Sequence, residues 1–334
     1  MQRKNDHIQE ALKQSFMPND FDKIRFEPVL LPETDIDAVD LSTSFLGQKF
    51  PYPVFINAMT GGTDKAHLIN DQLSKLAAKH GLAMATGSAA ITLRSPETKD
   101  SFSVIRKNHP SGFILANIGA DKSADNAADI VRLLNADALQ IHCNAPQEAV
   151  MPEGERNFIG WSANIKAMAE KVKVPTVVKN VGFGMTAADI KALKALGVTT
   201  IDVAGSGGTN FITIENARRN HPIDGFKSYG FSTVESLLEA EKVPDVDIIA
   251  SGGVRNAYDV IKALNLGAKA VGLSRYFLEL AVNYSFEDAD AMLSDFLDDL
   301  KKITALLGAK NIAELQEKPR LLDASLISFI NQRP

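Results

Sequence analysis

The amino-acid sequence predicts a (β/α)8 barrel, a TIM barrel of the α/β class, with an N-terminal extension and C-terminal helices. Three observations predict it: short apolar runs recur along the chain, helical patterns lie between them, and small or polar residues follow each run. Because the runs are continuously apolar rather than alternating, they are typical of a parallel sheet covered on both faces. They occupy residues 54–59, 82–88, 112–119, 138–144, 176–182, 200–205, 247–253 and 270–275. A doubly wound open sheet is the alternative arrangement of this pattern.

The segments between and after these runs carry helix signals. Residues 186–195 and 232–241 begin with capping residues, and residues 256–266 end at Gly267, a common helix stop. Polar amphipathic patterns predict two further helices at 286–307 and 321–331. We see no linker that divides the sequence, so we expect a single domain over 1–334. Its parts are an N-terminal flap and crossing segment (1–50), the barrel (51–285) and the C-terminal helices (286–334).

Composition and charge argue against nucleic-acid-binding and membrane-spanning proteins. With 334 residues and 45% hydrophobic content, the chain has enough apolar residues for a large core. A net charge of -5 and scattered Lys and Arg residues argue against a nucleic-acid surface, and no apolar run reaches membrane-spanning length. The N-terminus lacks the apolar core of a secretory signal, and Cys143 has no cysteine partner in the chain. We therefore expect a cytoplasmic protein that binds neither nucleic acid nor membrane.

Residues 248–255 and 270–275 each run from an apolar strand through a small-residue turn into a helix. Glycine lets backbone N–H groups approach an anion closely, and a helix N-terminus presents unpaired N–H groups to it. The loops after the last two strands of a (β/α)8 barrel are the usual place for a phosphate site. The pattern predicts a phosphorylated cofactor or substrate.

Lys179 ends an otherwise apolar run, where a desolvated ammonium group needs an anionic partner. A Schiff-base lysine is one interpretation. A counter-charge to an anionic reduced flavin is another, and the phosphate pattern favours flavin mononucleotide (FMN). The third is an ion pair with a structural carboxylate.

Residues 142–148 place an imidazole, two amides and a carboxylate around a proline bend. Glu148 is a hard oxygen ligand suited to Mg²⁺, but one carboxylate needs oxygens from a phosphorylated substrate and from water to complete the shell. The alternatives are that Glu148 is a surface carboxylate and that His142 is a satisfied strand-end histidine. Near the N-terminus, Arg3, Lys4 and His7 form a basic group that is either solvated or part of a flap over a diphosphate.

At these positions the chain resembles the type 2 isopentenyl-diphosphate isomerases, flavin-dependent enzymes of isoprenoid precursor synthesis. The resemblance runs almost end to end and rests on the order and strand-end placement of its motifs. They are Arg3-Lys4-x-x-His7, Met59-Thr60-Gly61-Gly62, Gly87-Ser88, Asn117-x-Gly119, His142-x-Asn144-x-x-Gln147-Glu148, Pro152-Glu153-Gly154, Lys179, Gly207-Gly208-Thr209 and Ser251-Gly252-Gly253.

The resemblance implies a role for each matched position. Around the flavin ring it places Ala58, Met59, Thr60, Ser88, Asn117 and Lys179. At the flavin phosphate it places Thr209, Gly252, Gly253, Arg255, Ser274 and Arg275. Substrate binding would fall to Arg3, Lys4, His7, Ser88 and Gln147, with Glu148 as the Mg²⁺ ligand and with Gln147, His142 and Asn144 lining the reacting end.

One departure concerns the diphosphate. Many relatives place an arginine two residues after the serine matched by Ser88, whereas this chain has Ala89-Ala90. Either Arg94 or Arg106 compensates, or the affinity for diphosphate is lower.

The implied reaction moves a proton across an unactivated alkene, from isopentenyl to dimethylallyl diphosphate, without net redox change. No side chain is an obvious acid for carbon, whereas reduced FMN can supply one. Gln147 is too weak a base alone, so we assign it orientation or proton relay, with the flavin or a bound phosphate oxygen as the alternative acceptor of the proton. NADPH is implied only as the reductant of the flavin. The family also suggests a homo-oligomer, a tetramer or octamer.

The alternative function is an FMN-dependent oxidoreductase of the α-hydroxy-acid oxidase type. That chemistry needs a histidine base and arginines that hold a carboxylate. Near the ends of the sixth and seventh runs the chain instead offers Ser206, Thr209, Asn210 and Arg255, and the first histidine after the sixth run is His221. An IMP-type dehydrogenase would need its thiol after the sixth run, whereas Cys143 ends the fourth. A non-catalytic flavin sensor would not need Lys179, Gln147 and Glu148 together.

Overall fold

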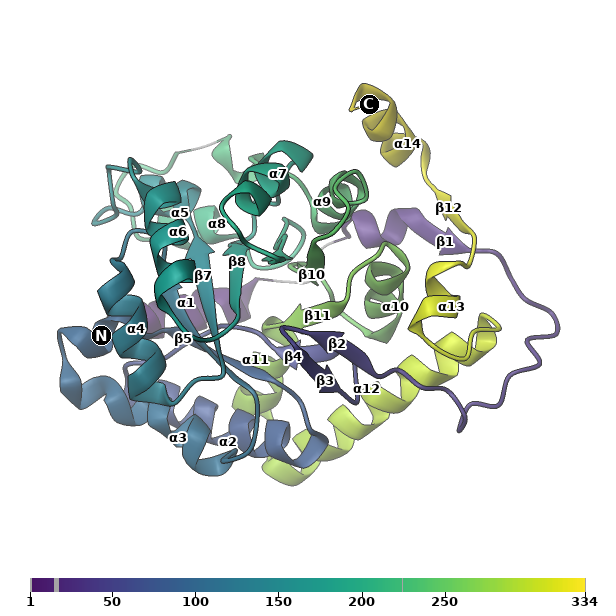
Figure 1. Cartoon of the computed structure of the whole chain (residues 1–334), viewed down its shortest axis with the longest axis horizontal. Helices are drawn as coiled ribbons and strands as arrows, with labels where there is room; N and C mark the ends of the chain where they lie inside the picture. The colour runs from purple at the N-terminus through teal and green to yellow at the C-terminus, as the bar shows by residue number, and fades with distance from the viewer. Residues whose placement is uncertain (1, 15–17, 224, 334) are drawn as a thin grey trace.

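The computed structural model describes residues 2–14, 18–223 and 225–333, and it leaves the side chains of residues 2, 3 and 5 undescribed. Parallel strands close into a barrel in the order β10-β11-β4-β5-β6-β7-β8-β9, which confirms the predicted fold class (Figure 1). Each of these barrel strands lies within its predicted apolar run. The strands are β4 (Val54–Ile56), β5 (Met84–Ser88), β6 (Ile114–Gly119), β7 (Ala138–Cys143), β8 (Thr176–Asn180), β9 (Thr200–Asp202), β10 (Asp247–Ser251) and β11 (Ala270–Leu273).

Helices surround the barrel and begin where the capping residues predict. Thr186 and Ser232 each form a capping box. The side chain of the cap residue accepts a hydrogen bond from the backbone N–H of the third helical residue, whose carboxylate accepts one from the backbone N–H of the cap residue. The outer helices are α2 (Asp64–His80), α3 (Asp100–Asn108), α4 (Ala124–Leu134), α6 (Trp161–Lys171), α7 (Ala187–Ala195), α9 (Thr233–Ala240), α10 (Ala257–Asn265) and α11 (Arg275–Asn283). Short helices lie in the loops: η2 (Ala89–Leu93), η3 (Pro96–Lys99), α5 (Ala145–Val150), α8 (Phe211–Ala217) and η4 (Phe226–Ser228).

A hairpin of β2 (Thr43–Phe45) and β3 (Gln48–Phe50) plugs the amino-terminal end of the barrel. Its turn places Leu46 and Gly47 at φ 53° and 75°, the conformation of a tight hairpin turn. Phe45 stacks on Phe50 at 4.4 Å between ring centroids and contacts Phe55 of β4, so the hairpin joins the apolar core inside the barrel. This end is closed, which leaves the carboxyl ends of the strands for a site.

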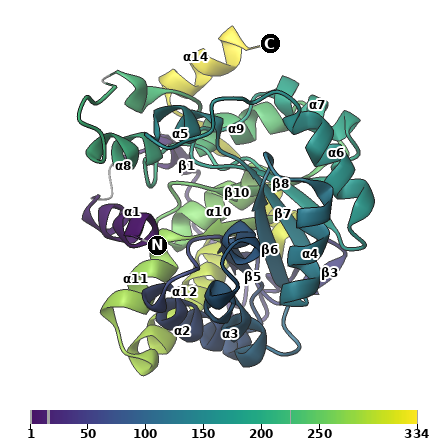
Figure 2. The same ribbon diagram turned by 90° about the vertical axis from the view of Figure 1, so that its left-hand side faces the viewer.

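The two ends of the chain pack against the barrel and against each other. The N-terminal part forms α1 (Gln2–Lys13), η1 (Asp20–Lys23) and β1 (Ile24–Phe26); the C-terminal part forms α12 (Phe286–Leu306), α13 (Ile312–Gln316), β12 (Arg320–Leu322) and α14 (Ala324–Gln332). Strand β1 pairs antiparallel with β12, and Figure 2 shows α1 beside α8 and α11.

The structure corrects one predicted helix. The helix predicted at 321–331 begins only at Ala324, because Asp323 caps it and β12 is held extended by its pairing with β1. Within the described ranges, no helix combines the length and apolar character needed to cross a membrane.

Candidate active site

A cavity of about 430 Å³ opens at the carboxyl ends of the barrel strands. Strand register determines which side chains meet there, because His142 lies opposite Lys179, and Lys179 lies opposite Asp202 on the next strand. The structure brings seventeen sequence-predicted site residues to the cavity wall. They are Lys4, His7, Ala58, Met59, Thr60, Ser88, Asn117, His142, Asn144, Gln147, Glu148, Lys179, Thr209, Gly252, Gly253, Ser274 and Arg275. The side chain of Arg3 lies outside the described residues.

A chain of buried polar side chains crosses the barrel beneath this cavity. Asn57 Nδ2 donates to Asp202 Oδ2 at 2.9 Å, and Gln140 Nε2 donates to Asn57 Oδ1 at 3.1 Å. Asn117 Nδ2 in turn donates to Gln140 Oε1 at 2.7 Å, and Asn117 Oδ1 lies 2.6 Å from His142 Nδ1. Sequence analysis assigned no individual role to Asn57, Gln140 or Asp202, although all three lie in the predicted strand runs. Their only sequence signal is a polar residue inside an apolar run.

These buried hydrogen bonds determine the tautomer of His142. Because the Asn117 amide nitrogen donates to Gln140, its oxygen is the group that faces His142, so His142 Nδ1 carries the proton and Nε2 is the acceptor. Burial and then the nearby Lys179 ammonium lower the pKa of His142 to about 4. His142 is therefore neutral near pH 7, and at the cavity it offers an acceptor rather than a positive charge.

Lys179 has the anionic partner that its position requires. Its Nζ lies 3.5 Å from Asp202 Oδ2 and donates to the Asn180 carbonyl at 2.6 Å. Asp202 is fully buried and also accepts hydrogen bonds from Ser251 Oγ at 2.7 Å and from the Ala204 backbone N–H at 3.1 Å. Lys179 thus has the structural carboxylate partner of the third interpretation, and it also lines the cavity.

At the opposite side of the cavity, α5 carries Gln147 and Glu148 as part of a helical turn rather than the expected proline bend. Gln147 Nε2 donates to Glu215 Oε1 at 2.8 Å, and His7 Nε2 lies 3.1 Å from the same oxygen. Arg218 donates to Glu215 Oε2 at 2.6 Å. Sequence analysis missed Glu215, whose signal is a carboxylate amid the apolar residues of α8.

Glu215 is fully buried but remains ionised. Burial alone would raise its pKa, but contacts from His7, Gln147 and Arg218 outweigh burial and lower the pKa to about 2. A carboxylate only accepts hydrogen bonds, so Glu215 fixes the Gln147 amide with its nitrogen toward α8. The Gln147 oxygen then faces Asn144, whose Nδ2 lies 3.4 Å away.

Glu148 is placed at the cavity wall with both carboxylate oxygens engaged. Oε1 accepts from Asn144 Nδ2 at 2.9 Å, and Oε2 accepts from the Glu155 backbone N–H at 2.8 Å. Each oxygen keeps a second lone pair for a cation. In the described part of the chain, no group of three or more His, Cys, Asp or Glu side chains forms a metal site. The donor set fits Mg²⁺ that takes its remaining ligands from water and a substrate diphosphate.

The other wall fits a flavin and its phosphate. Thr60 Oγ1 is buried at the cavity without a partner among the described residues, so it is available to a polar edge of a bound ring. The loops after β9 and β10 touch so closely that a Cβ on Gly208 would lie 2.6 Å from the Gly253 nitrogen. Helix α11 begins at Arg275, directly after Ser274, and both residues lie at the same wall. Bare backbone and a helix N-terminus are the features that bind phosphate in proteins.

Arg94 and Arg106 differ in position. Arg94 lines the cavity as an exposed side chain, together with Lys4 and Lys122. Arg106 lies away from it, and its guanidinium donates to the carbonyls of His109, Pro110, Gly112 and Asn135 and to Asp137. Of the two candidates named for the missing diphosphate arginine, only Arg94 is in position.

Arg255 does not line the cavity, in contrast to its expected place at the flavin phosphate. Its guanidinium binds Asp22 through Nη1 at 2.9 Å and Nη2 at 2.5 Å, and Nε binds Asp259 at 2.8 Å. Its backbone N–H also donates to Asp259. Two carboxylates therefore occupy the donors that a phosphate would need, and sequence alone could not show that Asp22 arrives from the N-terminal segment.

Cys143 is also excluded as a nucleophile at neutral pH. Burial raises the pKa of its thiol to about 12, so the reactive thiolate does not form.

Comparison with known proteins also indicates a flavin-binding barrel enzyme. Residues 116–322 match the family model described as FMN-dependent dehydrogenase. The chain is 46% identical to the isopentenyl-diphosphate delta-isomerase of Staphylococcus haemolyticus, over 99% of this chain and 96% of that protein. Over the same shares it is 44% identical to the proteins of that name from Staphylococcus epidermidis and Staphylococcus aureus.

Solved structures share the fold. The flavin-binding domain of baker's yeast flavocytochrome b2 superposes with a TM-score of 0.69 at 22% identity, covering 96% of this chain and 79% of that one. A mandelate oxidase variant superposes with a TM-score of 0.63 at 16% identity, covering 96% and 92%. At such identities the likeness extends to the barrel alone. The full-length relatives are decisive, and this chain therefore belongs to the FMN-dependent, type 2 family of isopentenyl-diphosphate delta-isomerases.

Proposed function

We propose that this protein isomerises isopentenyl diphosphate to dimethylallyl diphosphate with reduced FMN, Mg²⁺ at Glu148, and NADPH as the reductant of the flavin. The observation that carries the proposal is the division of one cavity into two ends. One end has the close-packed glycines and the unpartnered Thr60 hydroxyl, and the other has Gln147 held by ionised Glu215 beneath the basic side chains of α1.

When bound, reduced FMN supplies the acid that protonates the alkene carbon and an electron-rich ring beside the cation-like substrate. Ala58, Met59, Thr60, Ser88 and Asn117 would contact the ring. Lys179 would place its positive charge near an anionic flavin, with Asp202 fixing its position. Thr209, Gly252, Gly253, Ser274 and Arg275 would hold the phosphate.

The residues at the substrate end of the cavity would bind the diphosphate and orient the reacting carbons. Lys4, His7 and Arg94 would neutralise the diphosphate, with Glu148 and Mg²⁺ on its other side. Helix α1 lies over the barrel of its own chain, where Lys4 Nζ donates to the Ser88 carbonyl at 3.3 Å, so the proposal places the flap in cis. Gln147 would orient the reacting carbons or relay a proton. His142 and Asn144 would line the same end as uncharged groups, so they would not pair with the charge of the diphosphate.

The fold also permits an α-hydroxy-acid oxidase, the type of flavoenzyme among the structural neighbours. That reaction would need an arginine free to hold the substrate carboxylate. After β10 the chain offers Arg255, whose donors are bound to Asp22 and Asp259. The isomerase is therefore the better-supported function. We further propose a cytoplasmic homo-oligomer, a tetramer or octamer.

The test is anaerobic turnover in deuterated water with FMN, NADPH, Mg²⁺ and isopentenyl diphosphate. We expect dimethylallyl diphosphate that carries deuterium, with many turnovers per NADPH consumed. NADPH consumed in proportion to product would identify an oxidoreductase instead. In a parallel sample with excess chelator, we expect activity to disappear while the flavin stays bound; persistent activity would refute the role of Glu148.

A further inference from the structure

Asn19, just before η1, reaches the back of the two glycine loops that line the cavity. Its Nδ2 donates to the Gly207 carbonyl at 3.1 Å and to the Gly253 carbonyl at 2.9 Å. One side-chain amide therefore joins the loop after β9 to the loop after β10, from outside the cavity. No catalytic or binding role in the family resemblance falls on Asn19.

These two hydrogen bonds orient two peptide planes. In a planar trans peptide the carbonyl oxygen and the following N–H point in opposite directions, and the peptide bonds here are trans. Because Asn19 holds the Gly207 and Gly253 carbonyls on the outer side, the N–H groups of Gly208 and Val254 are directed to the other side. Both residues line the cavity, and neither N–H has an acceptor among the described residues. The arrangement leaves two backbone donors at the cavity wall for an anion.

The neighbouring peptide is held in the same way. Thr233 Oγ1, at the start of α9, donates to the Gly252 carbonyl at 2.5 Å and to the Ser251 carbonyl at 2.8 Å. Gly252 and Gly253 have φ of 88° and 75°, which residues with a side chain rarely adopt. Hydrogen bonds from two side chains outside the cavity, those of Thr233 and Asn19, therefore hold the carbonyls of this turn. Asn19 belongs to the N-terminal segment.

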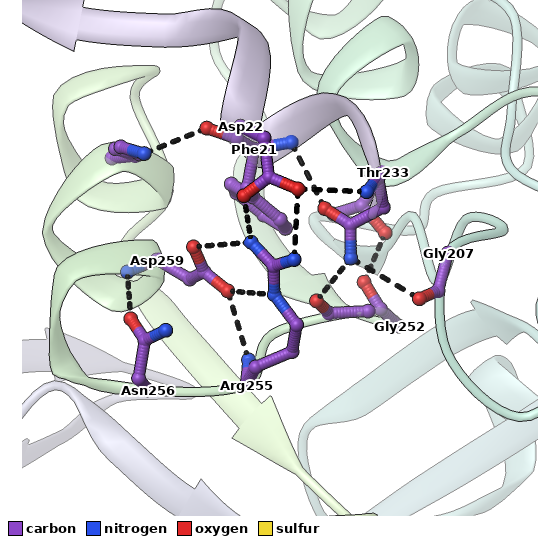
Figure 3. Close-up of polar contacts among 11 residues, drawn as sticks. Phe21, Asp22, Gly207, Thr233, Gly252, Arg255, Asn256 and Asp259 are labelled. Atoms are coloured by element: carbon purple, nitrogen blue, oxygen red, sulfur yellow. Dashed lines mark hydrogen bonds and ion pairs between the residues drawn. The ribbon is translucent and has the colours of Figure 1, made fainter. Parts of the chain in front are cut away.

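Asn19 is itself fixed by a cluster of charges, which Figure 3 shows around Arg255. Asn19 Oδ1 accepts from the Phe21 N–H at 3.0 Å, and the Asn19 N–H donates to Asp22 Oδ2 at 3.0 Å. Asp22 and Asp259 bracket the Arg255 guanidinium. Lys262 Nζ donates to the Phe21 carbonyl at 2.7 Å. Arg255 thus holds the segment that carries Asn19, instead of binding phosphate itself.

We propose that Asn19 is a positioning residue for the FMN phosphate, which it serves by aiming the Gly208 and Val254 N–H groups into the cavity. This inference rests on the proposed placement of the flavin phosphate at these loops. It also assigns Arg255 a role: with Asp22 and Asp259, it keeps Asn19 in place. The competing explanation is that Asn19 only anchors the chain, in which case its loss affects folding but not phosphate recognition in particular.

The test compares Asn19→Ser with Asn311→Ser. Serine keeps the side-chain acceptor that caps η1 but removes the amide donors. Asn311 caps α13 by accepting from the Glu314 N–H, so its replacement controls for the same chemical change at a cap remote from the cavity. Binding of FMN and of riboflavin, which lacks the phosphate, is measured by flavin fluorescence on apoprotein. The ³¹P chemical shift of bound FMN reports the phosphate environment directly.

We expect Asn19→Ser to weaken FMN binding about tenfold, the equivalent of about one net hydrogen bond, and to leave riboflavin binding unchanged. The ³¹P shift should move in Asn19→Ser but not in Asn311→Ser. Equal losses for FMN and riboflavin, or an unchanged ³¹P shift, would overturn the role of Asn19. Wild-type protein that binds riboflavin as well as FMN would instead refute the placement of the phosphate, which separates the two failures.

Discussion

Glu215 illustrates how one buried side chain organises the substrate end of the cavity. It contacts His7 from α1, Gln147 from α5 and Arg218, the residue directly after its own helix. Its pKa of about 2 keeps it ionised across the working range of pH. Because an ionised carboxylate only accepts, the Gln147 amide has a single favoured orientation. A neutral amide at position 215 would remove that constraint.

We therefore expect Glu215→Gln to lower kcat for isomerisation by about ten- to a hundredfold, since a hydrogen bond to a charged group contributes about 1.5–3 kcal/mol. Flavin affinity should not change, because Glu215 lies at the substrate end. Glu153→Gln is the control, since Glu153 binds Arg218 from the exposed side. Steady-state kinetics and flavin titration measure both quantities. A wild-type kcat in Glu215→Gln would remove Glu215 from the machinery.

At the scale of elements, the segment between β5 and α3 decides which arginine serves the cavity. Arg94 directly follows the short helix η2 and is exposed at the cavity wall. Arg106 lies in the last turn of α3, where it satisfies carbonyls around the turn that leads into β6. Two arginines twelve residues apart therefore have different surroundings: Arg94 lies at the cavity wall, whereas Arg106 is bound to backbone carbonyls and to Asp137 away from it.

We expect Arg94→Ala to raise KM for isopentenyl diphosphate about tenfold without lowering Tm, because one ion pair with the diphosphate is lost. Arg106→Ala should do the opposite: KM stays near the wild-type value and stability falls by about 2 kcal/mol. Kinetics and thermal unfolding of the two variants distinguish these effects. If Arg94→Ala leaves KM unchanged, the diphosphate is bound without Arg94.

At the scale of the whole molecule, contacts between the chain ends and the barrel complete the fold. Helix α14 packs Phe329 against Phe231 with ring centroids 5.1 Å apart, and Arg333 Nη2 donates to Glu239 Oε2 at 2.8 Å. Glu239 is almost fully buried and also binds Lys242 at 2.7 Å and the Ala187 backbone N–H at 2.9 Å. Burial alone would raise its pKa, but these partners outweigh burial and lower it to about 2.

The stability that Glu239 contributes should depend on pH. A carboxylate whose folded pKa lies below its unfolded value, here about 2 against 4.5, stabilises the fold above the unfolded value and loses that contribution as pH falls toward the folded one. We expect Glu239→Gln to lose about 2 kcal/mol at pH 7, and the gap to wild type to narrow between pH 5 and pH 3. Urea unfolding at several pH values measures this, with exposed Glu170→Gln as the control. A gap that stays constant would contradict the assignment.

The sequence by itself determined the barrel and its family. Apolar runs, the caps at Thr186 and Ser232, and glycines at the strand ends are local signals, because each depends on residues adjacent in the chain. The motif positions follow the same order in type 2 isopentenyl-diphosphate isomerases, and full-length relatives confirm that membership. The ligand roles of the individual site residues stay predictions.

Only the tertiary structure decided which side chains meet. Asp202 beside Lys179, Glu215 beside Gln147, and Asn19 behind the glycine loops are pairs that no local pattern links. Arg255 has the sequence context of a phosphate ligand, yet Asp22, 233 residues earlier in the chain, binds it instead. Such pairings depend on strand register and on where the closed barrel brings distant loops together, and these are properties of the folded chain as a whole.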